Sequence, residues 1–248
     1  MTENLDLIYE VFGDLPRGSP GSRETTKKAY SMLKPVPSQP CILDVGCGPG
    51  MQTLELARIS GGRITALDVY QPFLDRITQR AAGEGLAERV RTVNKSMLEM
   101  DFALESFDVI WAEGSIFIQG FEKGLKDWRK FLTKTGYFAV SDIAWLKENP
   151  PEEPLKFFTA EYPAMQMHEG NSKIISNLGY HLIKSFVFPK SDWLNYYNPV
   201  EIKLTALRKK YHGNQDANNF LDLILKEITI YKKYSKYYGY IFYLMHNK

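Results

Sequence analysis

The stretch DVGCGPG, residues 44–50, places three glycines on alternate positions directly after the apolar run Cys41-Ile42-Leu43. Glycine has no Cβ atom, so such a loop lets the backbone turn tightly and approach a ligand closely. The dinucleotide fingerprint G-x-G-x-x-G would need its third glycine at position 51, which is Met51. A P-loop would need Gly-Lys-Ser/Thr, and Met51-Gln52 stands in its place. The loop therefore predicts a ligand site that differs from both phosphate-binding motifs.

The segments around this loop alternate between strand and helix patterns. Met51, Leu54 and Ala57 recur at helical spacing before Gly61-Gly62, and Pro72 stands near the start of the next helical segment. The predicted strands span residues 41–45, 63–68, 90–94, 107–112, 137–141, 180–188 and 238–246. This order predicts an α/β fold with a doubly wound seven-stranded sheet, mostly parallel, and helices on both faces.

The composition narrows the class of protein. The 31 basic and 29 acidic residues give a net charge of +2, which lacks the basic excess of a dedicated nucleic-acid binder. Two cysteines in 248 residues do not make a disulfide framework. The sequence shows no signal-peptide pattern, no apolar run of about 20 residues and no pair of histidines at metal-ligand spacing. We therefore expect a cytoplasmic protein with no nucleic-acid partner, no membrane partner and no metal.

ILDVGCGPG resembles the first motif of the class I S-adenosylmethionine-dependent methyltransferases, and the resemblance covers most of the chain. RVRTVNKSMLEMDFALESFDVIWAEGSI, residues 89–116, resembles the third and fourth strands of that family. WRKFLTKTGYFAVSD, residues 128–142, resembles the helix, turn and fifth strand, although Gly136 is the one glycine kept of the usual turn. The resemblance implies a Rossmann-like fold whose last strand inserts antiparallel between the fifth and sixth. It also implies S-adenosylmethionine as the cofactor.

The resemblance implies roles for the residues of the cofactor site. The glycine loop would wrap the methionine end of the cofactor, and Asp44 would hold its ammonium directly or through the loop. The two ribose hydroxyls suit a carboxylate at the end of the neighbouring strand, and Asp68 lies there, eighteen residues after Gly50. Ser96-Met97 stands where the family meets the adenine, with Ser96 in place of the commoner Asp. The predicted cofactor-binding residues are Asp44, Gly46, Gly48, Gly50, Asp68, Val69, Ser96, Met97 and Glu113.

Candidate catalytic and substrate-binding residues follow from the position of the strand ends and of the predicted lid. Ligands of doubly wound sheets bind outside the carboxyl ends of the strands. This rule nominates Glu113 and Ser115 after one strand, and Asp142 and Trp145 after the next. Glu113 and His168, which lies beside the predicted lid, are the candidate catalytic residues, although each is compatible with an ordinary structural role. The substrate-binding candidates are Tyr9, Ser115, Trp145, Tyr196 and Tyr197.

Proline content and pattern changes divide the chain into four predicted regions. Residues 1–40 form a polar, turn-rich arm or lid, and residues 41–145 form the cofactor-binding core. Residues 146–180 form a lid insertion, because four prolines between 150 and 163 interrupt any continuous helix or strand. Residues 181–248 complete the same domain.

The leading interpretation is a methyltransferase that acts on a small molecule by in-line transfer. An NAD(P)-dependent oxidoreductase on a related fold is the alternative enzyme class, and the shifted glycine disfavours it. A methyltransferase-like binding module without catalysis is the alternative from outside enzymes. The acceptor, its nucleophilic atom, the use of a general base and the oligomeric state stay open at this point.

Overall fold

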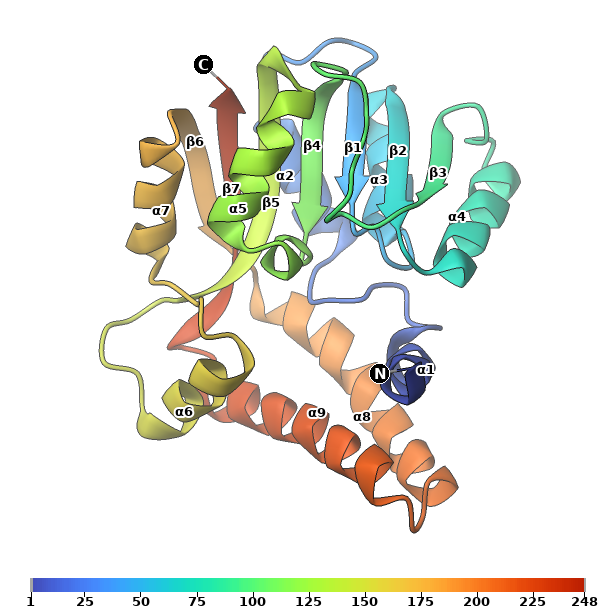
Figure 1. Cartoon of the computed structure of the whole chain (residues 1–248), viewed down its shortest axis with the longest axis vertical. Coiled ribbons are helices and arrows are strands. Elements are labelled where there is room, and N and C mark those ends of the chain that lie inside the picture. Colours follow the sequence, from blue (N-terminus) through green and yellow to red (C-terminus); the bar gives the residue numbers. More distant parts are fainter. Residues whose placement is uncertain (1, 248) are drawn as a thin grey trace.

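The computed structural model describes residues 2–247, with side chains from Leu7 onward, and Figure 1 shows their arrangement. Glycines end the two helices beside the second strand, as the spacing predicts. Helix α3 spans Met51–Ser60, and Gly61 follows it with a φ of 67°. Helix α4 spans Gln71–Gly83, and Gly85 follows it with a φ of 69°. Both glycines adopt the left-handed conformation that commonly ends a helix.

All seven predicted strands are present and form one sheet. They are β1 (Cys41–Val45), β2 (Arg63–Asp68), β3 (Val90–Asn94), β4 (Phe107–Glu113), β5 (Leu132–Trp145), β6 (Tyr180–Val187) and β7 (Tyr238–Asn247). The strand order is β3-β2-β1-β4-β5-β7-β6, and β7 runs antiparallel to both β5 and β6. The mostly parallel doubly wound sheet with an inserted antiparallel last strand is thus confirmed. The order reverses between β1 and β4, where ligands bind in folds of this kind.

Helices cover both faces of the sheet. Helices α5 (Phe121–Trp128) and α7 (His168–Asn177) lie on one face, and α2 (Arg23–Ser31), α3 and α4 pack on the other (Figure 1). The remaining helices are α1 (Thr2–Phe12), α6 (Glu152–Glu161), α8 (Lys190–Lys210) and α9 (Gln215–Tyr234), with short 3₁₀ turns η1 (Ile116–Ile118) and η2 (Arg129–Phe131). The carboxyl ends of β1, β2 and β4 point toward α1 and α8 (Figure 1).

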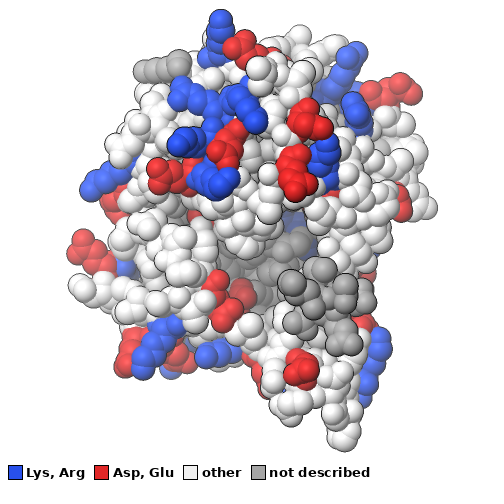
Figure 2. All heavy atoms as spheres, viewed as in Figure 1, with Lys and Arg blue, Asp and Glu red and all other residues white. Residues whose placement is uncertain are grey.

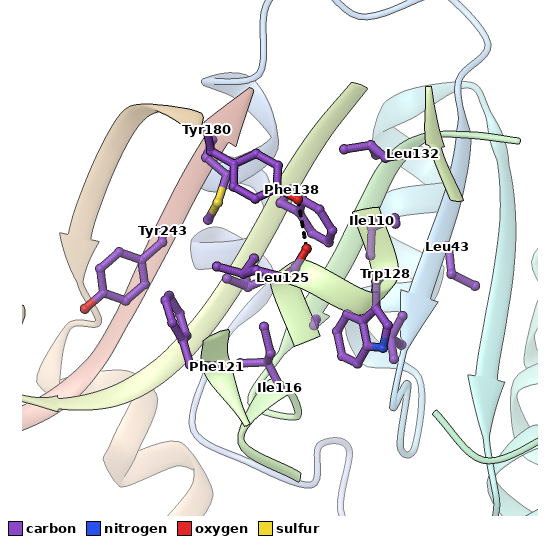
Figure 3. Packing of buried hydrophobic residues seen from close by; sticks show 14 of the residues in the cluster. Leu43, Ile110, Ile116, Phe121, Leu125, Trp128, Leu132, Phe138, Tyr180 and Tyr243 are labelled. Carbon is purple, nitrogen blue, oxygen red and sulfur yellow. Dashed lines mark hydrogen bonds between the residues drawn. The ribbon is translucent and has the colours of Figure 1, made fainter. Parts of the chain in front are cut away.

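The largest apolar cluster holds α5 against the sheet. Phe121, Leu125 and Trp128 recur at helical spacing on α5, and all three are buried. In Figure 3, Trp128 lies near Ile110 and Leu43 of the central strands, whereas Phe121 lies beside Tyr243 of β7, with ring centroids 5.3 Å apart. The hydroxyl of Tyr180 donates a 2.8 Å hydrogen bond to the carbonyl of Leu125, so the polar end of this buried ring is satisfied. This packing fixes the loop after β4, which carries part of the candidate site.

A second helical layer, made of α1, α6, α8 and α9, lies across the carboxyl end of the sheet (Figure 1). Helices α8 and α9 come between β6 and β7 in the chain, and their apolar stripes share a buried cluster with α1 and α6. Helix α1 was not expected from the sequence. Leu7 and Val11 on α1 and Leu15 shortly after its end are spaced four residues apart and buried, and this spacing was the available signal. We call α1, α6, α8 and α9 the helical cap.

Candidate active site

A cavity of about 580 Å³ lies between the carboxyl ends of the strands and the helical cap. Figure 2 shows the surface hollowed between the upper part of the molecule and the helices below it. Its lining comes from the glycine loop, from the loops after β2, β3 and β4, from the arm at 17–20, and from α1, α8, α9 and β7. The volume falls within the range of roughly 300–1,000 Å³ found for small-molecule sites.

The glycines of the opening loop have different neighbours. Gly46, Gly48 and Gly50 all have positive φ, at 68°, 52° and 84°. A Cβ on Gly46 would lie 2.6 Å from the Ser115 Cβ, and a Cβ on Gly50 would lie 2.2 Å from Ile77 Cγ1. A Cβ on Gly48 would meet nothing closer than the Gly18 nitrogen at 3.9 Å, and Gly48 lines the cavity. Close packing therefore explains the glycines at positions 46 and 50. At Gly48 the space that a side chain would fill is part of the cavity.

Asp68 ends β2 at the cavity and is tied to the glycine loop. Its Oδ2 accepts a 2.9 Å hydrogen bond from the backbone N–H of Gly48, and its Oδ1 accepts one of 3.0 Å from Tyr70. Burial raises the pKa of Asp68, and these backbone donors lower it. A carboxylate has about four acceptor positions, so Asp68 can receive further donors from a ligand.

Asp44 lies beneath the loop. It is fully buried, its Oδ2 accepts a 2.6 Å hydrogen bond from Thr53 Oγ1, and its Oδ1 has no hydrogen-bond partner among the described residues. Burial raises the pKa of Asp44 to about 7, the Thr53 hydrogen bond lowers it, and the Glu113 charge raises it. A positive charge held nearby would favour the carboxylate form. Because Asp44 is absent from the cavity lining, this arrangement fits an effect exerted through the loop.

Glu113 joins the arm to the end of β4. Its carboxylate is buried and forms an ion pair with Arg17, which is 4% exposed. Thr26 Oγ1 donates a 3.0 Å hydrogen bond to Glu113 Oε2, and Trp111 Nε1 donates another of 3.0 Å to the same oxygen. Both Glu113 oxygens thus already have donors, which suits an anchor of the arm better than a free base. Sequence reasoning named this arm as a lid but missed Arg17 as the partner of Glu113.

The structure brings most of the predicted site residues together. Tyr9 and Tyr196 lie on the cap side, and Ser115 donates a 2.5 Å hydrogen bond to the Val45 carbonyl. Predicted residues that line the cavity are Tyr9, Gly46, Gly48, Asp68, Val69, Ser96, Met97, Glu113, Ser115 and Tyr196. Asp44 and Gly50 do not line the cavity.

Three other predicted residues lie elsewhere. His168 begins α7, where its ring nitrogens are 3.3 Å from the Tyr243 hydroxyl and from Ser185 Oγ. Trp145 packs edge-on against Phe158 within the cluster that joins the cap to β5. Tyr197 is buried behind the lining, and its hydroxyl donates a 2.7 Å hydrogen bond to Glu227 Oε1.

Glu227 is a lining residue that sequence reasoning missed. It lies on α9 between Ile224 and Ile228, which are both buried. Ile224 and Tyr231 stand three residues before and four residues after it, on the same side of the helix. An acid on this apolar stripe was the available signal. Phe12 and Tyr240 also line the cavity.

The buried Asp142 on β5 should make the stability of the folded protein depend on pH. It is 2% exposed, and burial raises its pKa to about 7 although Tyr162 and the Ile143 N–H donate hydrogen bonds. The folded state therefore binds more protons than the unfolded state between about pH 4 and 7. The free energy of unfolding should fall as the pH rises through this window, by up to about 4 kcal/mol.

The Asp142→Asn variant tests this expectation, because its amide keeps an acceptor for Tyr162 but does not ionise. Urea unfolding at pH 5 and pH 8 should show the variant gaining stability relative to the native protein at the higher pH. A constant difference between the two proteins across that range would contradict the assignment.

Among residues 2–247, no helix combines the length and the apolar composition needed to cross a bilayer. Over the side chains that the structure describes, no group of three or more His, Cys, Asp or Glu is placed to hold a metal ion. Cys41 and Cys47 are both free thiols.

The chain is similar in sequence to known methyltransferases. Residues 42–136 match a family model described as a methyltransferase domain. The chain is 31% identical over 129 residues to methyltransferase GfsG of Streptomyces halstedii. The alignment covers 52% of this chain and 46% of that protein. It is 27% identical over 149 residues to a sterol 24-C-methyltransferase of Yarrowia lipolytica, covering 57% of this chain and 39% of that protein. The chain thus spans less than half the length of these two relatives.

A solved structure has the same fold over nearly the whole chain. It is an S-adenosylmethionine-dependent methyltransferase from Geobacter sulfurreducens in complex with S-adenosylhomocysteine. The TM-score is 0.83, the identity is 18%, and the alignment covers 97% of each chain. At this identity the likeness establishes the fold, including the strands of the late pair.

Proposed function

We propose that this chain, which belongs to the class I S-adenosylmethionine-dependent methyltransferases, transfers the methyl group of that cofactor to a small-molecule acceptor. The observation that carries the proposal is the single cavity that joins the glycine loop and Asp68 to the aromatic side chains of the cap. One end of this cavity offers the groups expected for the cofactor. The other end leaves room for an acceptor beside it.

The residues present fit the cofactor. Gly48 leaves open space for close approach, and the Asp68 carboxylate has acceptor positions for the two ribose hydroxyls. The unpartnered, buried Asp44 Oδ1 favours a positive charge on the other side of the loop, such as the methionine ammonium. Val69, Ser96 and Met97 line the part of the cavity assigned to the adenine, and Arg17 lines the arm side.

Bound S-adenosylmethionine supplies an activated methyl group on a positively charged sulfur. The chain's own contribution is alignment and exclusion of water, which for a well-oriented reaction lowers the barrier by roughly 7–11 kcal/mol. The arm at Arg17 and the cap helices enclose the site for this purpose. Because Glu113 is engaged by Arg17, Thr26 and Trp111, we assign it the role of holding the arm closed.

We infer a small molecule as the acceptor, and neither nucleic acid nor a membrane as partner. The similarity to a sterol 24-C-methyltransferase and the position of the cap over the cavity support this. The tyrosine- and lysine-rich stretch 231–240 offers few faces for base stacking, because Tyr231 and Tyr238 are buried. A cytoplasmic location is likewise our inference, from the two free thiols and the balanced charge.

Asp68→Ala tests the cofactor assignment. Calorimetry with S-adenosylhomocysteine should show at least about a tenfold loss of affinity, since each hydrogen bond to a charged group contributes about 1.5–3 kcal/mol. Because Asp68 also accepts the Gly48 N–H, the loss alone does not separate ribose binding from loop positioning. The 2′-deoxy analogue of S-adenosylhomocysteine makes that separation. It should bind more weakly than the parent to the native protein and equally to the variant.

NAD serves as the control ligand for the alternative enzyme class. The native protein should gain thermal stability with S-adenosylhomocysteine and none with NAD. Stabilisation by NAD alone would contradict the proposed function. A radiolabelled methyl donor with pooled small metabolites should then give a labelled product with the native protein.

A further inference from the structure

One end of the cavity combines a single carboxylate with aromatic rings. Glu227 comes from α9, Tyr196 from α8, Tyr240 from β7 and Phe12 from α1, and all four line the cavity. Phe12 and Tyr196 have ring centroids 6.0 Å apart and an interplanar angle of 12°. Burial is the main reason that the pKa of the Tyr196 and Tyr240 hydroxyls is raised. The Glu227 charge raises both further, after the Asp142 charge in the case of Tyr240, so Tyr196 and Tyr240 lie within electrostatic range of Glu227.

The Glu227 carboxylate has no cation to balance it in the described part of the chain. Its Oε1 accepts the hydrogen bond from Tyr197, and no ion pair to either oxygen is found among the described side chains. Burial raises the pKa of Glu227, the Tyr197 hydrogen bond lowers it, and the charge of Glu161 raises it. A half-buried carboxylate in this setting is stabilised when a ligand brings the missing positive charge.

The basic side chains in the described lining are already paired and come from other segments. Arg17 forms its ion pair with Glu113, and Lys95 forms one with Asp101. An anionic acceptor group at the Glu227 end would therefore meet negative charge and no free partner. A neutral apolar group would leave the carboxylate without compensation.

We propose that this end of the cavity is an acceptor subsite for an ammonium group, bound by the Glu227 carboxylate and by the ring faces of Tyr196, Tyr240 and Phe12. Aromatic faces attract cations through their quadrupole, and the attraction grows when water is excluded. The inference rests on the proposed function and deepens it, because it assigns amine-bearing small molecules as the acceptor class. The two ends of the cavity then match the cofactor and an acceptor that carries an ammonium group besides its nucleophilic atom, because a nitrogen in the ammonium form has no lone pair to attack the methyl group.

Choline and its uncharged carbon isostere, 3,3-dimethylbutan-1-ol, are the probes for this subsite. S-adenosylhomocysteine is titrated first into the full chain, and each probe is then titrated into the loaded protein. Choline should bind at least about tenfold more tightly than the isostere, which has the same shape without the charge. Equal affinities for the two probes would overturn the proposal.

Glu227→Gln tests the carboxylate itself, since glutamine keeps an acceptor for the Tyr197 hydroxyl. The variant should lose at least about tenfold in choline affinity while its affinity for the isostere and for S-adenosylhomocysteine stays native. Glu122→Gln, at an exposed position on α5, is the matched control and should change none of these. Native choline affinity in Glu227→Gln would refute the subsite and leave the proposed function intact. Failure of S-adenosylhomocysteine to bind the native protein would refute both.

Discussion

Gly48→Leu is expected to reduce the affinity for S-adenosylhomocysteine at least about a hundredfold while the protein still folds. At Gly48 the backbone has a φ of 52°, and an added side chain would enter the cavity, where the nearest atom to its Cβ is 3.9 Å away. The left-handed conformation costs a non-glycine residue roughly 1–2 kcal/mol, which a stable domain tolerates. The bulk, however, occupies the space assigned to the cofactor. Calorimetry and thermal unfolding measure the two effects separately.

Two other glycines provide matched controls. Gly85 has a φ of 69° and nothing within 4 Å of an added Cβ, so Gly85→Leu carries similar strain without touching the cavity and should bind normally. Gly50→Ala would place its Cβ 2.2 Å from Ile77 Cγ1, so it should lose stability through overpacking. If Gly48→Leu bound the ligand as Gly85→Leu does, the loop would not be the cofactor cradle.

The sheet could be predicted from the sequence because its signals are local. Short apolar runs punctuated by glycines marked all seven strands, and the structure contains each of them. Strand β5 is longer than its predicted 137–141, since the part from Asp142 to Trp145 pairs with β7 residues almost a hundred positions later. That extension depends on a partner from the end of the chain. No pattern within the segment could reveal it.

The candidate site also contains residues that local sequence motifs predict and residues that only the tertiary fold brings in. Gly48 and Asp68 belong to motifs with fixed spacing, and they meet at the cavity through a 2.9 Å hydrogen bond. Glu227 and Arg17 reach the cavity from α9 and from the arm, 159 and 51 positions away from Asp68, so only the packing of the cap brings them together. His168 is the opposite case, because it is close to the predicted lid in sequence but lies beside Tyr243 in the structure.

Glu113→Gln is expected to destabilise the protein by about 3–5 kcal/mol and to release the arm. The variant leaves the Arg17 guanidinium buried without an opposite charge, whereas Thr26 and Trp111 still have an acceptor oxygen. Lys123→Ala, which breaks a pair whose lysine side chain is 64% exposed, should cost less than about 1 kcal/mol. Urea unfolding measures both changes.

Limited digestion with trypsin separates release of the arm from a general loss of stability. Arg17 is 4% exposed in the native protein, so cleavage after it requires that the ion pair has opened. Glu113→Gln should be cut there under conditions in which the native protein and Lys123→Ala are not, as detected by mass spectrometry. The double variant Arg17→Met with Glu113→Gln should be more stable than Glu113→Gln alone, because no unpaired charge then stays buried. A double variant less stable than both single variants would show that the two residues act independently, and the assignment of Glu113 as the anchor of the arm would then fail.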